Sequence, residues 1–419
     1  MTLLIQGVLL DGHKKDIYIN KGIIEEISER CTRNADRIIN GKDKVALPSL
    51  INGHTHAAMT LLRGYADDMP LKEWLEGKIW PLENKMTADD IYWGSKFACL
   101  EMIKNGITVF NDMYWFWEST AKAVYDMGIR GFLSAVFIDM FDIKKSMEQI
   151  EYNIEIFELS DKYRPNVTFT LGPHAIYTVS KESLQWVRDF SEKHNILVHM
   201  HLSETDEETR FSQDRYGLSP TEFLDDIGVL SNRFIGCHGC WLDDRDCGIL
   251  KRNSAKLVHM PVSNLKLSVG RLFPYRHIKN VHNVPFCFGT DGCASNNHLD
   301  LIETMKFASL LAKFSTNDPT MLSAKETFDI ATKAAANIFF LPEWEIKIGN
   351  SPDIILVDTK KLELKPGFDI FSDIVYASNG YIVDTVICMG KVLMEDRYVP
   401  GEEDIIEEFS KTAHRLATK

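Results

Sequence analysis

The chain lacks an excess of basic residues and any long apolar run. Its 47 Lys+Arg stand against 60 Asp+Glu, a formal net charge of -13 over 419 residues, and no dense Lys/Arg cluster is present. Because an acidic surface repels polyanions, we expect no nucleic-acid partner. No apolar stretch approaches the roughly 20 residues that span a bilayer, so we expect no membrane association either.

A secretory signal and a disulfide framework are also missing. The first residues, 1–7, have neither the basic region nor the apolar core of a signal peptide. The eight cysteines are scattered, and CxxC spacing occurs once, at Cys237 and Cys240, with no second pair to complete a metal site. This usage is typical of reduced, mostly buried thiols in a cytoplasmic protein, and we interpret both residues as packing thiols.

Both ends of the chain are rich in short runs of β-branched residues separated by turns. Such closely spaced runs predict antiparallel β structure. We expect the two ends to form one small β-sandwich domain from residues 1–48 and 346–419. The runs are 3–8, 16–27, 353–357, 373–377, 381–389 and 391–394.

Between the ends, strand-like and helix-like segments alternate, which is typical of an α/β fold with a parallel sheet. Eight strand-like runs predict a (β/α)8 barrel over residues 49–345, with a doubly wound open sheet as the alternative. The strand-like runs are 45–51, 108–111, 131–137, 167–171, 196–201, 234–237, 256–260 and 285–289. The clearest helical segments are 88–104, 118–127, 181–193 and 221–227.

Histidine and aspartate gather where these runs end. Five of the eight runs end in His or Asp, and six of the chain's 13 histidines lie there. In such barrels the carboxyl ends of the strands carry the chemistry. The concentration predicts a site at one end of the barrel, built from His54, His56, His174, His199, His201, His238 and Asp291.

A metal ion explains this histidine pattern best. His54 and His56 are alternate residues and therefore share one side of a strand. With a third nitrogen from His201 and an oxygen from Asp291, they would hold a divalent ion such as zinc and leave a position for water. The alternative for an isolated HxH pair is that the two histidines lie on the surface by chance, without a function, or are hydrogen-bonded residues of the core.

Glu204 lies three residues beyond His201 and is a candidate general acid/base facing a metal-bound water. The acidic residues that follow, 206–208, are expected to be solvated. His238 could hydrogen-bond a hydroxide or a developing oxyanion. His199 shares the strand face of His201 but lies deeper, where it is either a core histidine or a partner of a metal ligand.

Several motifs together resemble the amidohydrolase superfamily. Within it they resemble the adenosine-type aminohydrolases, which deaminate S-adenosylhomocysteine, methylthioadenosine and 5'-deoxyadenosine. The resemblance runs almost from end to end of the chain. It is carried by NGHTH (52–56), MTLLRG (59–64), LKEWL (71–75), IWPLE (79–83), GPH (172–174), HLSE (201–204), SNLKL (263–267) and GTDGCASNN (289–297).

The resemblance implies one divalent metal ion, most often Zn2+, although Fe2+, Mn2+ and Ni2+ would also suit the ligands. It assigns metal binding to His54, His56, His201 and Asp291. It also implies the barrel with a two-ended β-sandwich, a small nucleoside substrate, and a homo-oligomer, either dimer or tetramer.

The resemblance also implies roles in the reaction. Glu204 would protonate the purine ring, Asp291 would accept a proton from the metal-bound water, and His238 would orient the resulting hydroxide. Glu83 would bind the ribose hydroxyls. His174 would be a further substrate contact, and Trp74 would border the base, unless it is simply part of the core.

The sequence departs from the pattern of some relatives at the residues expected to bind the 5' end of the substrate. Some relatives hold the carboxylate of S-adenosylhomocysteine with arginines after the third strand, whereas residues 135–146 contain no Arg and only Lys144 and Lys145 as cations. This favours a shorter 5' substituent, although these lysines or Arg271 could substitute for the arginines.

Other activities remain as alternatives. The same site would serve guanine or cytosine aminohydrolases or triazine chlorohydrolases, and a non-catalytic barrel relative is the alternative outside enzymes. The HxE…PCxxC signature of cytidine deaminases is absent from the sequence.

Overall fold

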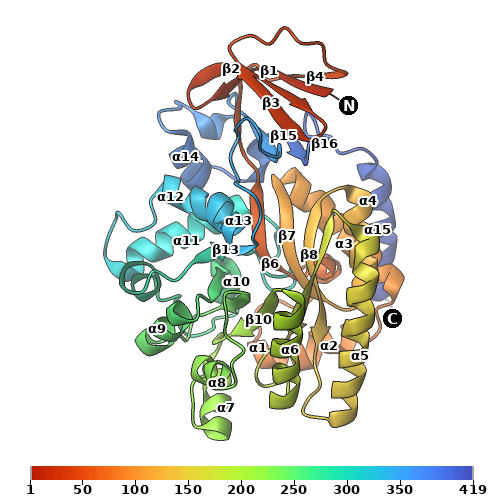
Figure 1. Cartoon of the computed structure of the whole chain (residues 1–419), viewed down its shortest axis with the longest axis vertical. Helices are drawn as coiled ribbons and strands as arrows, with labels where there is room; N and C mark the ends of the chain where they lie inside the picture. The colour runs from red at the N-terminus through yellow and green to blue at the C-terminus, as the bar shows by residue number, and fades with distance from the viewer. Residues whose placement is uncertain (1, 418–419) are drawn as a thin grey trace.

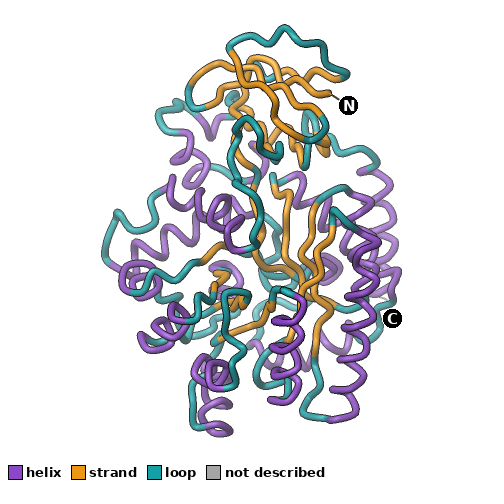
Figure 2. The backbone as a smooth tube through the Cα atoms, viewed as in Figure 1, coloured by secondary structure: helices purple, strands orange, loops and turns teal. Residues whose placement is uncertain are grey.

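Eight parallel strands form a barrel at the centre of the molecule, as the sequence predicts. The computed structural model describes residues 2–417, apart from the side chains of residues 71 and 72, and Figures 1 and 2 show the strands surrounded by helices. Neighbouring strands follow the order of the sequence from β6 to β13. They are β6 (Leu50–Thr55), β7 (Ile107–Tyr114), β8 (Arg130–Phe137), β9 (Val167–Pro173), β10 (Val198–Leu202), β11 (Phe234–His238), β12 (Lys256–His259) and β13 (Phe286–Phe288).

The first and last strands come together to close the barrel. The backbone N–H groups of Thr290 and Asp291 both donate to the carbonyl of His54, at 3.1 and 3.0 Å. Two glycines allow this approach: a Cβ on Gly53 would lie 2.6 Å from Cys287 Sγ, and one on Gly289 would lie 2.8 Å from His54 N. Barrel closure therefore sets His54 directly beside the Asp291 turn.

Strands from both ends of the chain form a second, mixed sheet, which lies above the barrel in Figure 1. Its order is β16-β15-β14-β5-β1-β2-β3, with β4 paired to β1. The joining of the two ends in one β unit was predicted. The strands are β1 (Thr2–Leu10), β2 (His13–Asn20), β3 (Ile23–Ser28), β4 (Arg37–Asn40), β5 (Lys44–Pro48), β14 (Ile354–Asp358), β15 (Val383–Cys388) and β16 (Lys391–Met394).

The run 45–51 is not one barrel strand, and this prediction was wrong. Its first part is β5, which pairs with β14 in the terminal sheet, and its last part begins β6 in the barrel. The chain changes sheets after Pro48, which has no N–H to donate. The N–H of Ser49 still bonds to Asp353 O in the terminal unit, whereas that of Leu50 bonds to Gly106 O at the barrel.

The helices that connect the barrel strands have clear start signals in the sequence. Thr87, Ser219 and Asp243 each form a capping box, so that α3, α8 and α9 begin where the sequence offers a side-chain acceptor. The four predicted helices are confirmed as α3, α4, α6 and α8. The helices are α3 (Ala88–Lys104), α4 (Trp117–Met127), α5 (Ile143–Leu159), α6 (Lys181–His194), α7 (Asp206–Tyr216), α8 (Pro220–Asp226), α9 (Asp244–Arg252), α10 (Pro261–Lys266) and α11 (Leu301–Thr316).

Further helical segments lie before α3 and after α11. The predicted strand 373–377 is wrong: this segment is helical and continues a helix capped by Asp369, whose carboxylate accepts from the N–H groups of Phe371 and Ser372. The segments are α1 (Leu71–Trp74), α2 (Trp80–Glu83), α12 (Ala324–Asp329), α13 (Ala335–Ile338), α14 (Ile370–Ser372) and α15 (Glu402–Ala417). Short 3-10 and π turns are η1 (Ala57–Leu62), η2 (Leu75–Ile79), η3 (Ser160–Tyr163), η4 (Arg276–Val281), η5 (Ile330–Ala334), η6 (Leu362–Leu364), η7 (Asp373–Ala377) and η8 (Gly380–Ile382).

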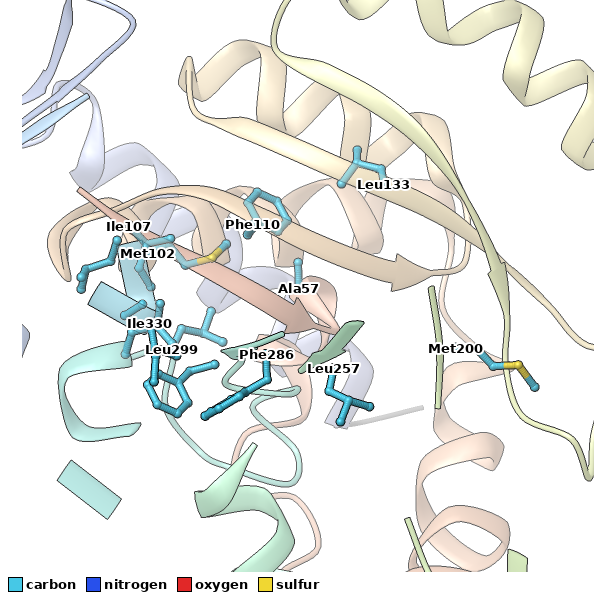
Figure 3. Packing of buried hydrophobic residues seen from close by; sticks show 14 of the residues in the cluster. Ala57, Met102, Ile107, Phe110, Leu133, Met200, Leu257, Phe286, Leu299 and Ile330 are labelled. Carbon is cyan, nitrogen blue, oxygen red and sulfur yellow. The ribbon is translucent and has the colours of Figure 1, made fainter. Parts of the chain in front are cut away.

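Apolar side chains fill both the space between barrel and helices and one end of the barrel interior. Figure 3 shows members of the outer cluster, among them Phe110 and Leu133 on neighbouring strands. A separate inner cluster joins strand residues such as Val109 and Val258 to Phe339 and Trp344, from the segment after η5. The amino-terminal end of the barrel is therefore packed with apolar groups, and polar chemistry is confined to the other end.

The last helix, α15, returns to the barrel and packs against α3 (Figure 1). Phe97 and Phe409 stack with ring centroids 3.9 Å apart, and Arg415 forms an ion pair with the buried Asp90. Within residues 2–417, no helix is both long and apolar enough to cross a membrane.

Candidate active site

The carboxyl ends of the barrel strands bring His54, His56, His201 and Asp291 together. Asp291 Oδ1 lies 3.4 Å from Nε2 of His54 and 3.4 Å from Nε2 of His56. Ligand atoms of the three histidines all lie within 4.8 Å of one another. Four residues that are distant in the sequence thus face one point at the barrel mouth.

The imidazole rings of this cluster are held by their outer nitrogens. His56 Nδ1 lies 2.7 Å from the Met113 carbonyl, and His201 Nδ1 lies 2.8 Å from the His174 carbonyl. A carbonyl can only accept, so each Nδ1 carries the proton and donates. In a neutral imidazole this leaves the Nε2 lone pair facing the point where His54, His56, His201 and Asp291 converge, which we call the centre.

Asp291 is held as firmly as the histidines. Its Oδ2 accepts from the hydroxyls of Ser263 (2.6 Å) and Ser295 (3.0 Å), and its Oδ1 accepts from the N–H of Gly292 (2.8 Å). Three donors stabilise the charged form of a buried carboxylate. The centre therefore holds one fixed negative charge among its imidazoles.

This donor set fits a divalent metal ion. His54 Nε2 is buried and makes no hydrogen bond to any group that the structure describes, since Asp291 Oδ1 at 3.4 Å is only a long ion-pair contact; the ring is held through its other nitrogen. An unpartnered buried nitrogen is costly unless it ligates something. Three imidazole nitrogens and one carboxylate oxygen are ligands that zinc and similar ions prefer, with a position left for water.

Three residues of the site lie in strained backbone at or just beyond the ends of the strands. Ser203, His238 and Asp291 have φ of 48°, 75° and 64°, a region that non-glycine residues rarely adopt. Such strain persists where the surrounding contacts enforce it, commonly at functional sites. Here the sharp turns direct His238 and Asp291 toward the centre instead of continuing the strands.

A cavity of about 680 Å³ opens above the centre, lined by all the predicted metal-binding residues except His54. Glu204 and His238 both line it and lie side by side, with Oε2 and Nε2 3.7 Å apart. Burial raises the pKa of the Glu204 carboxyl, and His238 offsets this only in part. Burial alone would lower the pKa of His238, but the facing Glu204 and Asp291 carboxylates raise it.

Glu208 corrects one expectation from the sequence. It was expected to be solvated, yet only 2% of its surface is exposed. Its carboxylate accepts from the N–H groups of Ser203 (3.0 Å) and Glu204 (2.8 Å). Because α7 starts at Asp206, its first turn places Glu208 back over the end of β10, where it fixes the backbone that carries Glu204.

The remaining predicted contacts, Trp74, Glu83 and His174, line the same cavity. Burial raises the pKa of Glu83, whose Oε1 accepts from the Tyr114 hydroxyl at 2.6 Å. Burial lowers the pKa of His174 to about 3, so its ring is neutral. The cavity thus offers a carboxyl, a neutral imidazole and an indole in addition to the histidine centre.

The three cations that could replace the missing arginines lie in different places. Lys145 lines an outer cavity of about 1420 Å³, which shares Trp80, Glu83 and other wall residues with the inner cavity. Lys144 is 87% exposed and pairs with Glu148. Arg271 lies over the Trp241 ring at 4.1 Å and lines a separate cavity of about 640 Å³.

Sequence reasoning did not single out four residues that hold the site's side chains. Ser263 and Ser295 donate to Asp291, Tyr114 donates to Glu83, and Asn264 accepts from His238 Nδ1 at 2.8 Å. The SNLKL and GTDGCASNN motifs contain three of these four residues, so the motifs could have pointed to them. Tyr114 ends a strand with no motif. The eight cysteines are free and buried, as predicted, including Cys237 and Cys240.

Comparison with known proteins gives the family. The sequence profile of the amidohydrolase family matches residues 45–393. The chain belongs to this family. It is 46% identical, over 94% of its length and 89% of the relative's, to a 5'-deoxyadenosine deaminase of Methanoregula boonei. It is 42% identical, over 94% of its length and 93% of the relative's, to 5-methylthioadenosine/S-adenosylhomocysteine deaminase 1 of Archaeoglobus fulgidus.

Solved structures share the fold of this chain. An adenosine deaminase of Xanthomonas campestris with bound zinc superimposes with a TM-score of 0.92 at 29% identity, covering 100% of this chain and 98% of that one. A triazine hydrolase superimposes with a TM-score of 0.89 at 22% identity, covering 98% and 99%, which indicates a shared fold.

Proposed function

We propose that this amidohydrolase is a metal-dependent deaminase of adenosine-type nucleosides, which it converts with water into the inosine analogue and ammonia. The observation that carries the proposal is the position of Glu204. Its carboxyl lies 3.7 Å from His238 Nε2, in the wall of the cavity that is also lined by His56, His201 and Asp291. This pairs a proton donor with a site for activated water, and both are needed to replace the amino group of an aromatic ring.

His54, His56, His201 and Asp291 would hold the metal ion, for which we propose Zn2+ ahead of Fe2+, Mn2+ and Ni2+. The ion supplies Lewis acidity, which lowers the pKa of water enough to provide a nucleophile at neutral pH. Support for zinc comes from the three nitrogens and one oxygen of the donor set and from the zinc in the Xanthomonas campestris structure.

The residues around this centre divide the proton transfers. Glu204, with its raised pKa, donates a proton to the ring nitrogen next to the reacting carbon. Asp291 accepts a proton from the attacking water, whose oxygen bonds to that carbon. His238 is fixed by Asn264 and hydrogen-bonds this oxygen. Asp291 then passes its proton to the amino group, the added hydroxyl returns its proton to Glu204, and the carbon–nitrogen bond breaks to release ammonia and leave the carbonyl of the inosine ring.

A substrate panel tests the proposal directly. We expect 5'-deoxyadenosine, methylthioadenosine, S-adenosylhomocysteine and adenosine to show the ultraviolet change from an adenine to a hypoxanthine ring. Turnover of guanine, cytosine or a triazine without turnover of any adenine nucleoside would contradict it.

Glu83 is proposed to bind the ribose hydroxyls. A hydrogen bond to a charged group contributes about 1.5–3 kcal/mol, so Glu83→Gln should lower kcat/KM for a ribonucleoside by about 10–100-fold. The control is a 2',3'-dideoxy substrate, which has no hydroxyl to offer this carboxyl. If kcat/KM falls by the same factor for both substrates, Glu83 supports the cavity and does not bind the ribose.

We propose that the enzyme prefers substrates with short 5' substituents, because the wall of the outer cavity around Lys145 includes the apolar side chains of Met140, Phe116 and Ile138. A solvent-exposed ion pair changes binding by about fivefold at most. Lys145→Met should therefore lower kcat/KM for S-adenosylhomocysteine by about fivefold or less and leave that for methylthioadenosine unchanged. Lys144→Met, one residue away, should change neither value. A loss for S-adenosylhomocysteine far above fivefold would show that Lys145 is a dedicated carboxylate ligand.

We also propose a cytoplasmic location and a role in the salvage of nucleosides derived from S-adenosylmethionine. The eight free cysteines support a reducing compartment.

A further inference from the structure

Beneath the proposed metal site lies a further buried imidazole, that of His199. It is fully buried on β10, two residues before His201 and on the same inner face of the strand. Its Nε2 lies 2.7 Å from Nδ1 of His54, and Cys237 Sγ lies 3.4 Å from that same nitrogen. His54 therefore differs from His56 and His201, whose outer nitrogens meet backbone carbonyls.

Spacing excludes a second metal ion held by this group. His54, His199 and Cys237 are close enough to suggest one. However, two nitrogens bound to one tetrahedral zinc at about 2.0–2.1 Å lie about 3.3 Å apart. The observed 2.7 Å is a hydrogen-bond distance, so one proton lies between His54 and His199.

The position of that proton decides whether His54 can bind metal. If His199 Nε2 holds it, His54 Nδ1 accepts, and a neutral His54 must carry its own proton on Nε2, where it blocks a metal ion. If His54 Nδ1 holds it, Nε2 presents a lone pair to the centre. His199 is then the acceptor, and its own proton lies on Nδ1, which has no partner among residues 2–417.

We propose that His199 is a positioning residue for the metal site: as a hydrogen-bond acceptor, it holds His54 in the tautomer that ligates through Nε2. The inference rests on the proposed metal-dependent function. Because the acceptor is a side chain and not a backbone carbonyl, it can be removed by mutation, unlike the partners of His56 and His201. Partners of this kind typically change metal affinity by about 10–100-fold.

A matched pair of variants separates the effect of the hydrogen-bond acceptor from that of side-chain size. His199→Gln keeps an oxygen that can accept from His54 Nδ1, whereas His199→Met fills a similar volume and offers only a weak acceptor. His199→Ala removes the group altogether. His259→Gln is the control, because His259 is a buried histidine on β12, two strands from β10, and it bonds to the Tyr275 hydroxyl.

The measurement is the dissociation constant for Zn2+ of each full-length protein, obtained by competition with a chelator, together with the melting temperature of each metal-free form. We expect His199→Met and His199→Ala to bind Zn2+ about 10–100-fold more weakly, and His199→Gln and His259→Gln to stay close to the unchanged protein. The visible absorption of bound Co2+ should change in the Met and Ala variants and be restored in the Gln variant.

Two results would overturn the inference and leave the proposed function standing. One is equal Zn2+ affinity in all the proteins; the other is an equal loss of Zn2+ affinity in the Gln, Met and control variants, which would indicate a general packing effect. If the unchanged protein binds no stoichiometric Zn2+, Co2+ or other divalent ion, the proposed function fails together with the inference.

Discussion

Glu204→Gln is expected to lower deaminase turnover by about 10²–10⁴-fold, the usual contribution of a positioned acid/base group. The substitution keeps the size of the side chain and the backbone contacts from Glu208, but the amide cannot donate the proton that the ring nitrogen needs. Bound metal should remain, because Glu204 is not among the proposed ligands. The measurement is turnover per bound metal ion with 5'-deoxyadenosine as substrate.

Glu207→Gln is the matched control for this substitution. Glu207 is exposed in the first turn of α7, three residues from Glu204, so the same chemical change should leave turnover unaltered. Near-full turnover of Glu204→Gln with its metal in place would remove Glu204 from the mechanism.

Asp291→Asn should lower deaminase turnover by a similar factor, but for a different reason. The amide has no charge to bind the metal ion and cannot accept the proton of the attacking water. Its NH2 group would also face the N–H or hydroxyl donors that now converge on the carboxylate. We expect turnover to fall by about 10³-fold or more and bound metal to fall with it.

Ser263→Ala provides a graded comparison with Asp291→Asn. It removes one hydrogen bond to Asp291 Oδ2 and leaves the carboxylate itself in place. Metal affinity should fall by about 10–100-fold, while enzyme saturated with metal keeps most of its turnover. If Asp291→Asn keeps both metal and turnover, Asp291 is neither ligand nor proton acceptor.

The barrel and the position of the site could be predicted because periodic signals carry them. Apolar runs alternate with amphipathic segments, and histidines follow the runs. HxH at 54–56 and HLSE at 201–204 therefore indicate one end of the barrel from the sequence alone. Parallel strands all end at the same edge, so the sequence positions translate directly into proximity.

The rest depends on contacts that no local pattern specifies. The run 45–51 reads as continuous, and only the pairing of Leu50 with the barrel shows that the chain changes sheets after Pro48. Glu208 looks like its solvated neighbours until the first turn of α7 places it over the end of β10. His199 could be a core residue or a ligand's partner, and the choice needed the distance to His54.

The most direct test of the account measures bound metal and turnover in the same preparation. A chelator is used to strip the protein, and Zn2+ is then returned in steps while turnover of 5'-deoxyadenosine is followed. We expect turnover to disappear with the metal and to return in proportion, reaching its maximum at one ion per chain. Full turnover by protein that contains no divalent metal would contradict it.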